Sequence, residues 1–289
     1  NNRFKSKDYD SMVDTPIHMG TFETYKFKVN KFYHYIIINN VSEVEFPSEF
    51  LDDIRKICNS CHKLLDVNDS CLNNYNFILH LLEEGYGGLE HDNSSVLQFS
   101  WKYLIQKNGY RKLLQLFGHE YFHQWNVRRL RPIEYLNYNY SEEVISDGLW
   151  FAEGVTSYFD ISLPFISGIS SKLELLQDLS EDISIILSTP GRNVQSLSES
   201  SKEAWIKLYK SNSTSKNSQI SYYRLGSITS FCLDIRLRQV GSSLSSVLRK
   251  LWNKYGIDNK GYTRENIFEI LSNIDQSISN DLSQWLDVP

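Results

Sequence analysis

The sequence predicts an α+β protein with two lobes. Its 289 residues are enough to bury a large core, as one large domain or as two lobes. Strand patterns fall within residues 21–99, whereas from residue 111 onward the apolar positions recur at helical spacing. Strands first and helices later are typical of an α+β fold. We therefore expect an N-terminal α/β lobe at residues 1–110 and a helical lobe at residues 111–289.

The first predicted elements are strands in residues 21–50, where aromatic and β-branched side chains recur on both sides of a turn at Asn30 and Lys31. A helix is expected over residues 48–66, with Ser48 as its N-cap.

Two further apolar runs, Tyr75–Leu82 and Val96–Phe99, extend the strand pattern. Between them, residues 85–88 break the periodicity, and by themselves they predict an ordinary Gly-Gly turn. A polar segment without an apolar anchor, Ser211–Gln219, predicts a surface loop or a mobile flap. The predicted later helices are 111–126, 141–160, 171–188, 199–210, 224–240, 243–255 and 263–286.

Charge and hydropathy exclude some classes of protein. A formal net charge of -5 gives no electrostatic reason to expect a nucleic-acid partner. No apolar run approaches the roughly 18 residues needed for a membrane span. The chain begins at Asn1 and shows no signal-peptide pattern, so we expect a processed or excised piece of a cytoplasmic protein, with a removed signal peptide as the open alternative.

The four cysteines, Cys58, Cys61, Cys71 and Cys232, are too few for a disulfide scaffold in a chain of this length. Cys58, Cys61 and His62 formally match the pattern for covalent haem attachment. However, the surrounding apolar residues recur at helical spacing, which favours small buried thiols over a haem or a second zinc site.

The strongest chemical signal is the HExxH pattern of His119, Glu120 and His123. Residues four apart on a helix project from the same face, so both imidazoles can reach one zinc ion at roughly 2.0–2.1 Å. The Glu120 carboxylate can then lie beside a water on the metal without binding the metal itself. The alternative is a pair of core histidines, because a bare HExxH also occurs by chance.

A catalytic zinc needs a third protein ligand. Context favours Glu153, because its aromatic helical surroundings, residues 149–159, require a counter-charge that a zinc ion supplies. The alternative is a surface glutamate that pairs with Arg128 or Arg131. Spacing alone leaves these candidates open: Glu134, Glu142, Glu143, Asp147 and Glu153.

Two of these segments, HEYFHQWNVRRLRP (119–132) and LWFAEGVTSYF (149–159), together resemble the glycyl aminopeptidase family of gluzincin zinc metallopeptidases. The resemblance runs from about residue 11 to about residue 270, and it depends on several motifs in the same order. The further matching segments are Val13–Gly20, which resembles the start of the family's catalytic domain, Gly87–His91, which resembles its substrate-binding loop, and residues 197–209 and 222–236.

The resemblance implies a thermolysin-like catalytic domain, with a small β-containing lobe and a mostly helical lobe. Relatives usually carry a β-rich N-terminal domain and a PDZ-like C-terminal domain, for which this chain has no room. One motif departs from the family pattern Tyr-x-Lys-Gly, because here it reads Tyr223-Arg224-Leu225-Gly226. Leu225 replaces the usual lysine, and Arg224 is a candidate to supply its charge.

The resemblance also implies roles for individual residues. His119, His123 and Glu153 would bind one catalytic zinc ion, and Glu120 would be the general base. Tyr223 would donate a hydrogen bond to the oxyanion of the transition state.

Substrate binding is implied for the Gly87–His91 segment. Glu90 would pair with the free α-ammonium of the substrate, and Gly87 and Gly88 would let the substrate backbone come close. Trp125 and Asn126 are better interpreted as packing and support.

These observations predict a zinc-dependent aminopeptidase that hydrolyses the N-terminal bond of peptides and favours small residues such as glycine. Its partners would be peptides with a free N-terminus. The alternatives are a gluzincin endopeptidase, which would accept N-blocked peptides, and a pseudo-peptidase that binds peptides without cleaving them.

Overall fold

The computed structural model describes residues 3–39, 44–66, 73–137 and 139–289. Contacts group the chain into two compact units, residues 1–61 with 68–124 and residues 62–67 with 125–289. A five-stranded sheet lies in the first unit, and most of the helices belong to the second. The predicted α+β class is therefore confirmed.

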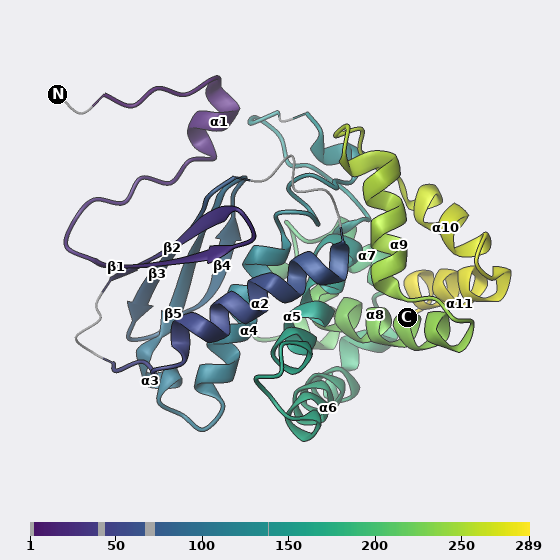
Figure 1. Cartoon of the computed structure of the whole chain (residues 1–289). Helices are drawn as coiled ribbons and strands as arrows, with labels where there is room; N and C mark the ends of the chain where they lie inside the picture. Colours follow the sequence, from purple (N-terminus) through teal and green to yellow (C-terminus); the bar gives the residue numbers. More distant parts are fainter. Residues whose placement is uncertain (1–2, 40–43, 67–72, 138) are drawn as a thin grey trace. The chain divides into compact units, whose positions relative to one another are not determined.

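The sheet of the first unit has the strand order β1-β2-β3-β5-β4 (Figure 1). Its two outer pairs, β1 with β2 and β4 with β5, are antiparallel, whereas the central pairs are parallel. The bounds are β1 Glu23–Val29, β2 Phe32–Asn39, β3 Tyr75–Leu82, β4 Tyr86–Glu90 and β5 Ser94–Ser100.

The predicted turn between the first two strands is confirmed. Val29 of β1 pairs with Phe32 of β2, so Asn30 and Lys31 form a two-residue hairpin loop. Asn30 has a φ of 51°, a left-handed conformation that asparagine tolerates better than most residues.

Helices α2 (Phe50–Leu65) and α4 (Gly109–Phe122) carry most of the helical core of the first unit. The ring centroid of Phe117 in α4 lies 5.0 Å from that of Phe77 in β3 and 6.0 Å from that of Phe50 in α2. α4 also packs against β4 and β5. Two short helices complete this unit, α1 (Tyr9–Val13) and α3 (Trp101–Leu104).

α2 corrects one sequence prediction and confirms another. It begins at Phe50, so Ser48 is not its N-cap. Cys58 and Cys61 are buried in the core, as the helical spacing predicted, and burial raises the pKa of both thiols. Cys71 lies outside the described residues.

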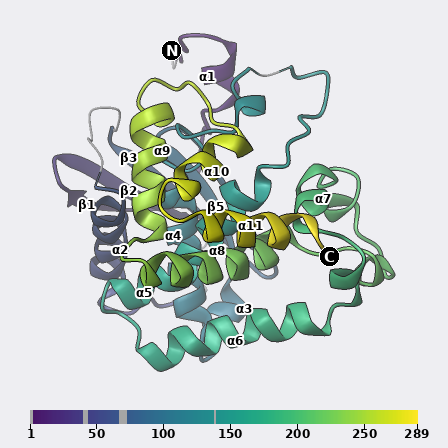
Figure 2. The ribbon, with the colours of Figure 1, turned by 90° about the vertical axis from the view of Figure 1, so that its right-hand side faces the viewer.

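The second unit is built around α8 (Tyr222–Gln239), which contacts five α-helices and one π-helical turn of this unit (Figure 2). α6 keeps its predicted bounds to within one residue, and a capping box formed by Ser171 and Glu174 begins it. The helices around α8 are α5 (Val155–Ile166), α6 (Lys172–Ser188), α7 (Leu197–Lys202), α9 (Leu244–Leu251) and α11 (Gln276–Asp287).

Three of the predicted long helices are wrong in length. The helix expected at 141–160 begins only at Trp150, as a π-helical turn, η4 (Trp150–Gly154), that continues into α5. The helix expected at 199–210 ends at Lys202, and a 3-10 turn, η6 (Leu208–Lys210), follows later. The helix expected at 263–286 is two helices, α10 (Arg264–Ser272) and α11.

Asp275 explains that last break, since its side chain accepts a hydrogen bond from the backbone N–H of Ser277 and so begins α11 anew. The remaining short helices are η3 (Ile133–Tyr135), η5 (Pro190–Asn193), η7 (Ser215–Asn217) and a π-helical turn after α9, η8 (Trp252–Gly256). Among the helices of the described residues, none combines the length and the apolar character needed to cross a bilayer.

Candidate functional site

His119 and His123 lie one turn apart at the C-terminal end of α4. His119 is in the last turn, and His123 follows the helix with φ and ψ of -61° and -16°, so the helical geometry continues through it. The centroids of the two imidazole rings are 4.7 Å apart. The predicted spacing of two nitrogen ligands on one helical face is therefore present.

Glu120 is buried, with 3% of its surface exposed, and its side chain packs against the backbone of Gly88. A Cβ atom at Gly88 would lie 2.6 Å from Cγ of Glu120, closer than side chains normally approach. Gly88 is in β4, which is an edge strand of the sheet. The Gly-Gly turn or loop expected here is therefore wrong, because Gly87 and Gly88 are paired with β5.

Glu90 lies on the same face of β4 as Gly88, because residues two apart in a strand point the same way. Its partner in the register is Ser95, which is fully buried. Burial raises the pKa of Tyr75 well above its ordinary value, and the charges of Glu120 and Glu90 raise that pKa further. The negative charges of Glu90 and Glu120 therefore both act on the buried phenol of Tyr75.

The N-terminal motif at Val13–Gly20 contacts the end of β4 through Asp14. One carboxylate oxygen of Asp14 is 3.2 Å from Nδ1 of His91, and the other accepts a hydrogen bond of 3.0 Å from the backbone N–H of Asp92. Two motifs that are far apart in the sequence therefore meet directly after Glu90. The family resemblance marked both segments, but no local pattern indicated that Asp14 and His91 pair.

Glu153 is part of the π-helical turn η4, where every other residue is buried. π-turns inside helices frequently occur at functional sites. The side-chain amide of Asn126, itself fully buried, donates to the carbonyl oxygens of Phe151 and Ala152 at 3.1 and 3.0 Å. Asn126 therefore holds the backbone directly before Glu153, which agrees with its predicted supporting role.

Trp125 is also buried, and its ring packs edge-on against His62 at a centroid distance of 5.1 Å. This contact agrees with the predicted packing role.

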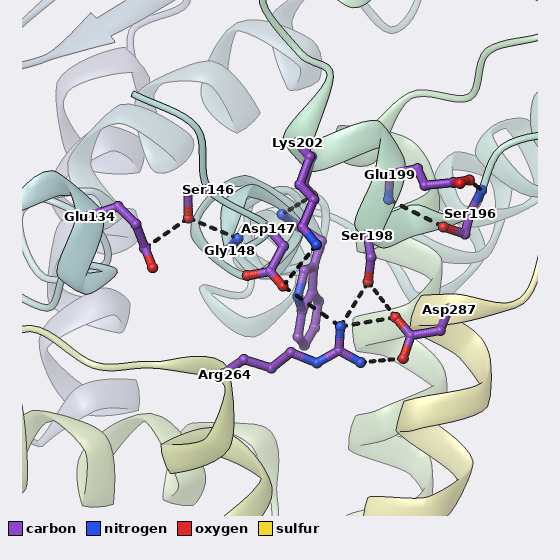
Figure 3. A network of polar contacts seen from close by, with 12 residues as sticks. Glu134, Ser146, Asp147, Gly148, Ser196, Ser198, Glu199, Lys202, Arg264 and Asp287 are labelled. Carbon is purple, nitrogen blue, oxygen red and sulfur yellow. Dashed lines mark hydrogen bonds and ion pairs between the residues drawn. The ribbon is translucent and has the colours of Figure 1, made fainter. Parts of the chain in front are cut away.

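Two other candidates for the third ligand have different partners (Figure 3). Glu134 accepts a hydrogen bond of 3.0 Å from Ser146. Asp147 lies 3.8 Å from the charged nitrogen atoms of both Lys202 and Arg264. Glu142 and Glu143 are exposed.

The network in Figure 3 also supports the start of η4. The backbone N–H of Trp150 donates to Oγ of Ser201 at 3.0 Å, which satisfies one of the free donors at this helix start. Ser201 belongs to α7, whose Ser198 donates to Asp287, the residue that Arg264 binds with both terminal nitrogens. The polar network thus connects the approach to Glu153 with α7, α10 and α11.

Tyr223 stands in the first turn of α8, one turn before Gly226. A Cβ atom at Gly154 would lie 2.5 Å from Cα of Gly226, and one at Gly226 would lie 2.8 Å from Cα of Gly154. The two backbones are therefore in direct contact, and any larger residue would separate η4 from α8. This glycine pair holds Glu153 and Tyr223 on neighbouring helices.

The environment of Tyr223 keeps its phenol protonated. Burial raises its pKa far above the ordinary value, and the charge of Glu153 adds to that increase. Arg224, the candidate to replace the family's lysine, forms an ion pair with Asp182 of α6 at 3.3 Å. Leu225 is half-buried.

The ligand atoms of His119, His123 and Glu153 all lie within 4.8 Å of one another. Two imidazoles and one carboxylate are a donor set that catalytic zinc uses in peptidases. Among the described residues, these three side chains lie close enough together to hold one metal ion. The residues present therefore fit a zinc ion.

Comparisons with known proteins indicate a metallopeptidase. The family model of the M61 glycyl aminopeptidases matches residues 112–229, and the resemblance seen in the sequence is confirmed. A crystal structure of an aminopeptidase N family protein from Idiomarina loihiensis has 31% sequence identity and a TM-score of 0.92 over 98% of this chain. This chain spans about half of that protein, 49% of its length. No protein of curated function matches the sequence.

Two more distant structures share the fold. An M1 zinc metallopeptidase from Deinococcus radiodurans is 10% identical with a TM-score of 0.59, and the alignment covers 92% of this chain and 52% of that one. Yeast LTA4 hydrolase in complex with bestatin is 15% identical with a TM-score of 0.62, over 92% of this chain and 39% of that one.

Proposed function

We propose that this chain is the catalytic part of a zinc-dependent aminopeptidase that releases N-terminal residues from peptides and favours small ones such as glycine. The main support for the proposal is the short distance between the ligand atoms of His119, His123 and Glu153, which all lie within 4.8 Å of one another. The match to the glycyl aminopeptidase model over residues 112–229 supports it, because that segment contains all three residues.

His119, His123 and Glu153 would hold the zinc ion. When bound, zinc polarises the scissile carbonyl and lowers the pKa of a coordinated water to about 7. Glu120 takes the proton from the attacking water and passes it to the leaving amine. Its burial against Gly88 restricts where the carboxylate can lie, and a restricted base needs little reorganisation during the reaction.

Tyr223 donates a hydrogen bond from its hydroxyl group to the oxyanion that forms at the scissile carbonyl. The raised pKa of this phenol supports the role, because a deprotonated tyrosine could not donate.

Glu90 accounts for the exopeptidase specificity. Its carboxylate lies on the same strand face as Gly88, which packs on the general base. A carboxylate there can pair with the free α-ammonium of a peptide, a charge that internal peptide bonds lack. Substrate backbone can align along β4 because this strand is at the edge of the sheet.

Metal binding is expected to depend on Glu153. In the Glu153→Ala variant, zinc affinity should fall by more than the roughly 10- to 100-fold that follows loss of a residue supporting a ligand. Glu142→Ala and Glu143→Ala are matched controls, because both residues are exposed and precede the helix. Zinc content after dialysis against a chelator measures the effect, and full occupancy in Glu153→Ala would exclude Glu153 as a ligand.

A second expectation concerns the free N-terminus. Glu90→Gln should lower kcat/KM on free-amine peptides by about ten- to hundred-fold, the size of one charge-assisted hydrogen bond. The same variant should leave the rate on N-acetylated peptides unchanged, since these substrates have no ammonium group. Glu84→Gln, an exposed carboxylate two residues before β4, serves as the control and should match the wild type on both substrates.

The same peptide pairs separate the alternative functions. Equal cleavage of acetylated and free peptides by the wild type would favour the gluzincin endopeptidase. Binding of peptides without cleavage by the zinc-loaded protein would favour the pseudo-peptidase.

A further inference from the structure

The turn that follows Glu90 joins β4 to β5 and is closed by backbone hydrogen bonds. Glu90 is the last residue of β4 and pairs with Ser95 of β5. Directly after it, the backbone N–H of His91 donates to the carbonyl oxygen of Ser94 at 2.8 Å. Because β4 is an edge strand, it pairs with another strand of the sheet on one side only. The position of Glu90 therefore depends on the contacts that hold this turn.

Asp14 binds this turn from a segment that is distant in the sequence. One of its carboxylate oxygens lies 3.2 Å from Nδ1 of His91, and the other accepts a hydrogen bond of 3.0 Å from the backbone N–H of Asp92. Only 21% of the Asp14 side chain and 10% of the His91 side chain are exposed. Hydrogen bonds to a carboxylate are roughly twice as strong as neutral ones, and shielding from water preserves this strength. Asp14 therefore fixes the first two residues after Glu90.

The segment that carries Asp14 is itself fixed on both sides. Asp14 is the C-cap of α1, and its backbone N–H donates to the carbonyl oxygen of Asp10 at 3.0 Å. Two residues later, Pro16 restricts the backbone through its ring. Beyond it, the imidazole of His18 packs against that of His80 in β3, at a centroid distance of 5.4 Å. Asp14 thus lies between a short helix and a contact with the centre of the sheet.

We propose that Asp14 is a positioning residue for recognition of the substrate N-terminus, because it holds the end of β4 where the Glu90 carboxylate can pair with the α-ammonium. This inference rests on the proposed function of Glu90. Hydrogen bonds weaken steeply when their distance or angle departs from the optimum, so a small displacement of Glu90 weakens its bond to the ammonium. Asp14 acts through the turn and not through contact with the substrate.

The test is a double-mutant cycle on free-amine peptides with the full-length protein. Asp14→Ala should lower kcat/KM by about 3- to 10-fold, a part of the loss expected for Glu90→Gln. In a Glu90→Gln background, Asp14→Ala should have no further effect, because the charge that Asp14 positions is absent. A purely structural role would instead lower kcat/KM by the same factor in both backgrounds, which would overturn the inference.

A second readout compares free-amine with N-acetylated peptides, which have no ammonium group. The ratio of kcat/KM on the free-amine peptide to kcat/KM on the acetylated one should fall by about 3- to 10-fold in Asp14→Ala. Asp14→Asn keeps a carbonyl oxygen that can accept from the backbone N–H of Asp92, so this ratio should fall less than in Asp14→Ala. A wild-type ratio in Asp14→Ala would contradict the proposed role.

Asp8→Ala is the matched control for a general effect of α1. The Asp8 carboxylate caps α1 by accepting from the backbone N–H of Ser11 at 2.8 Å, so its removal weakens this helix and keeps the Asp14 side chain. Asp8→Ala should therefore have the wild-type kcat/KM. An equal loss in Asp8→Ala and Asp14→Ala would assign the effect to α1 as a whole and overturn the inference.

The same measurements distinguish failure of this inference from failure of the proposed function. A loss of kcat/KM in Glu90→Gln together with wild-type values in Asp14→Ala would overturn the role of Asp14 and leave the proposed function intact. Wild-type kcat/KM in Glu90→Gln would overturn the role of Glu90 and, with it, the inference about Asp14.

Discussion

Replacement of Glu120 by Gln should lower kcat by about 10²- to 10⁴-fold, the range typical of a lost general base, while zinc remains bound. Gln has nearly the shape of Glu, so the packing against Gly88 is preserved and only the proton acceptor is lost. Steady-state kinetics on a free-amine glycyl peptide, combined with metal analysis of the same sample, separates catalysis from metal binding. Glu142→Gln is the control, because Glu142 is an exposed carboxylate of the same chain.

Two results would contradict the assignment of Glu120. Wild-type activity in Glu120→Gln would mean that another group is the base. Loss of zinc along with activity would mean that Glu120 helps to hold the metal.

Replacement of Tyr223 by Phe should lower kcat by about 10²- to 10³-fold, the cost typical of losing one oxyanion donor. KM should change little, because the hydrogen bond strengthens mainly in the transition state. The ring itself remains, so its stacking on Tyr222 should hold the local structure. Kinetics over a series of peptide concentrations gives kcat and KM separately.

Tyr222→Phe is the matched comparison for Tyr223. Tyr222 is buried and its hydroxyl reaches Tyr209, so the variant should lose stability and only a small part of kcat. A larger loss of kcat in Tyr222→Phe than in Tyr223→Phe would show that the tyrosine motif is aligned one residue out of place.

Several features could be predicted from local patterns. The HExxH spacing placed His119 and His123 on one helical face, and helical spacing predicted buried thiols at Cys58 and Cys61. The hairpin at Asn30 followed from turn chemistry and from alternation in the flanking strands. In each case the signal lies within one or two turns of helix or one strand pair, so local sequence is sufficient.

Other predictions of secondary structure were wrong because contacts with residues distant in the sequence determine the local conformation. The helix at 141–160 was expected to be continuous, yet helical structure begins at Trp150, whose backbone N–H is bound by Ser201. Asn126 then satisfies carbonyl groups within the π-helical turn that carries Glu153. Residues 85–88 were expected to form a turn because they break the apolar periodicity, but pairing with β5 makes Gly87 and Gly88 part of strand β4.

Patterns in the sequence were sufficient to predict the α+β class, the pair of histidines one turn apart and a short set of carboxylates that could complete a zinc site. Only the tertiary structure distinguished those carboxylates, since Glu134 and Asp147 bind other side chains while Glu153 joins the histidines. It also decided that Gly88 adjoins Glu120, that Gly154 meets Gly226 and that Tyr209 reaches Tyr223. These contacts could not be predicted because the burial and the hydrogen-bond partners of a side chain depend on packing between segments that are distant in the sequence and share no periodicity.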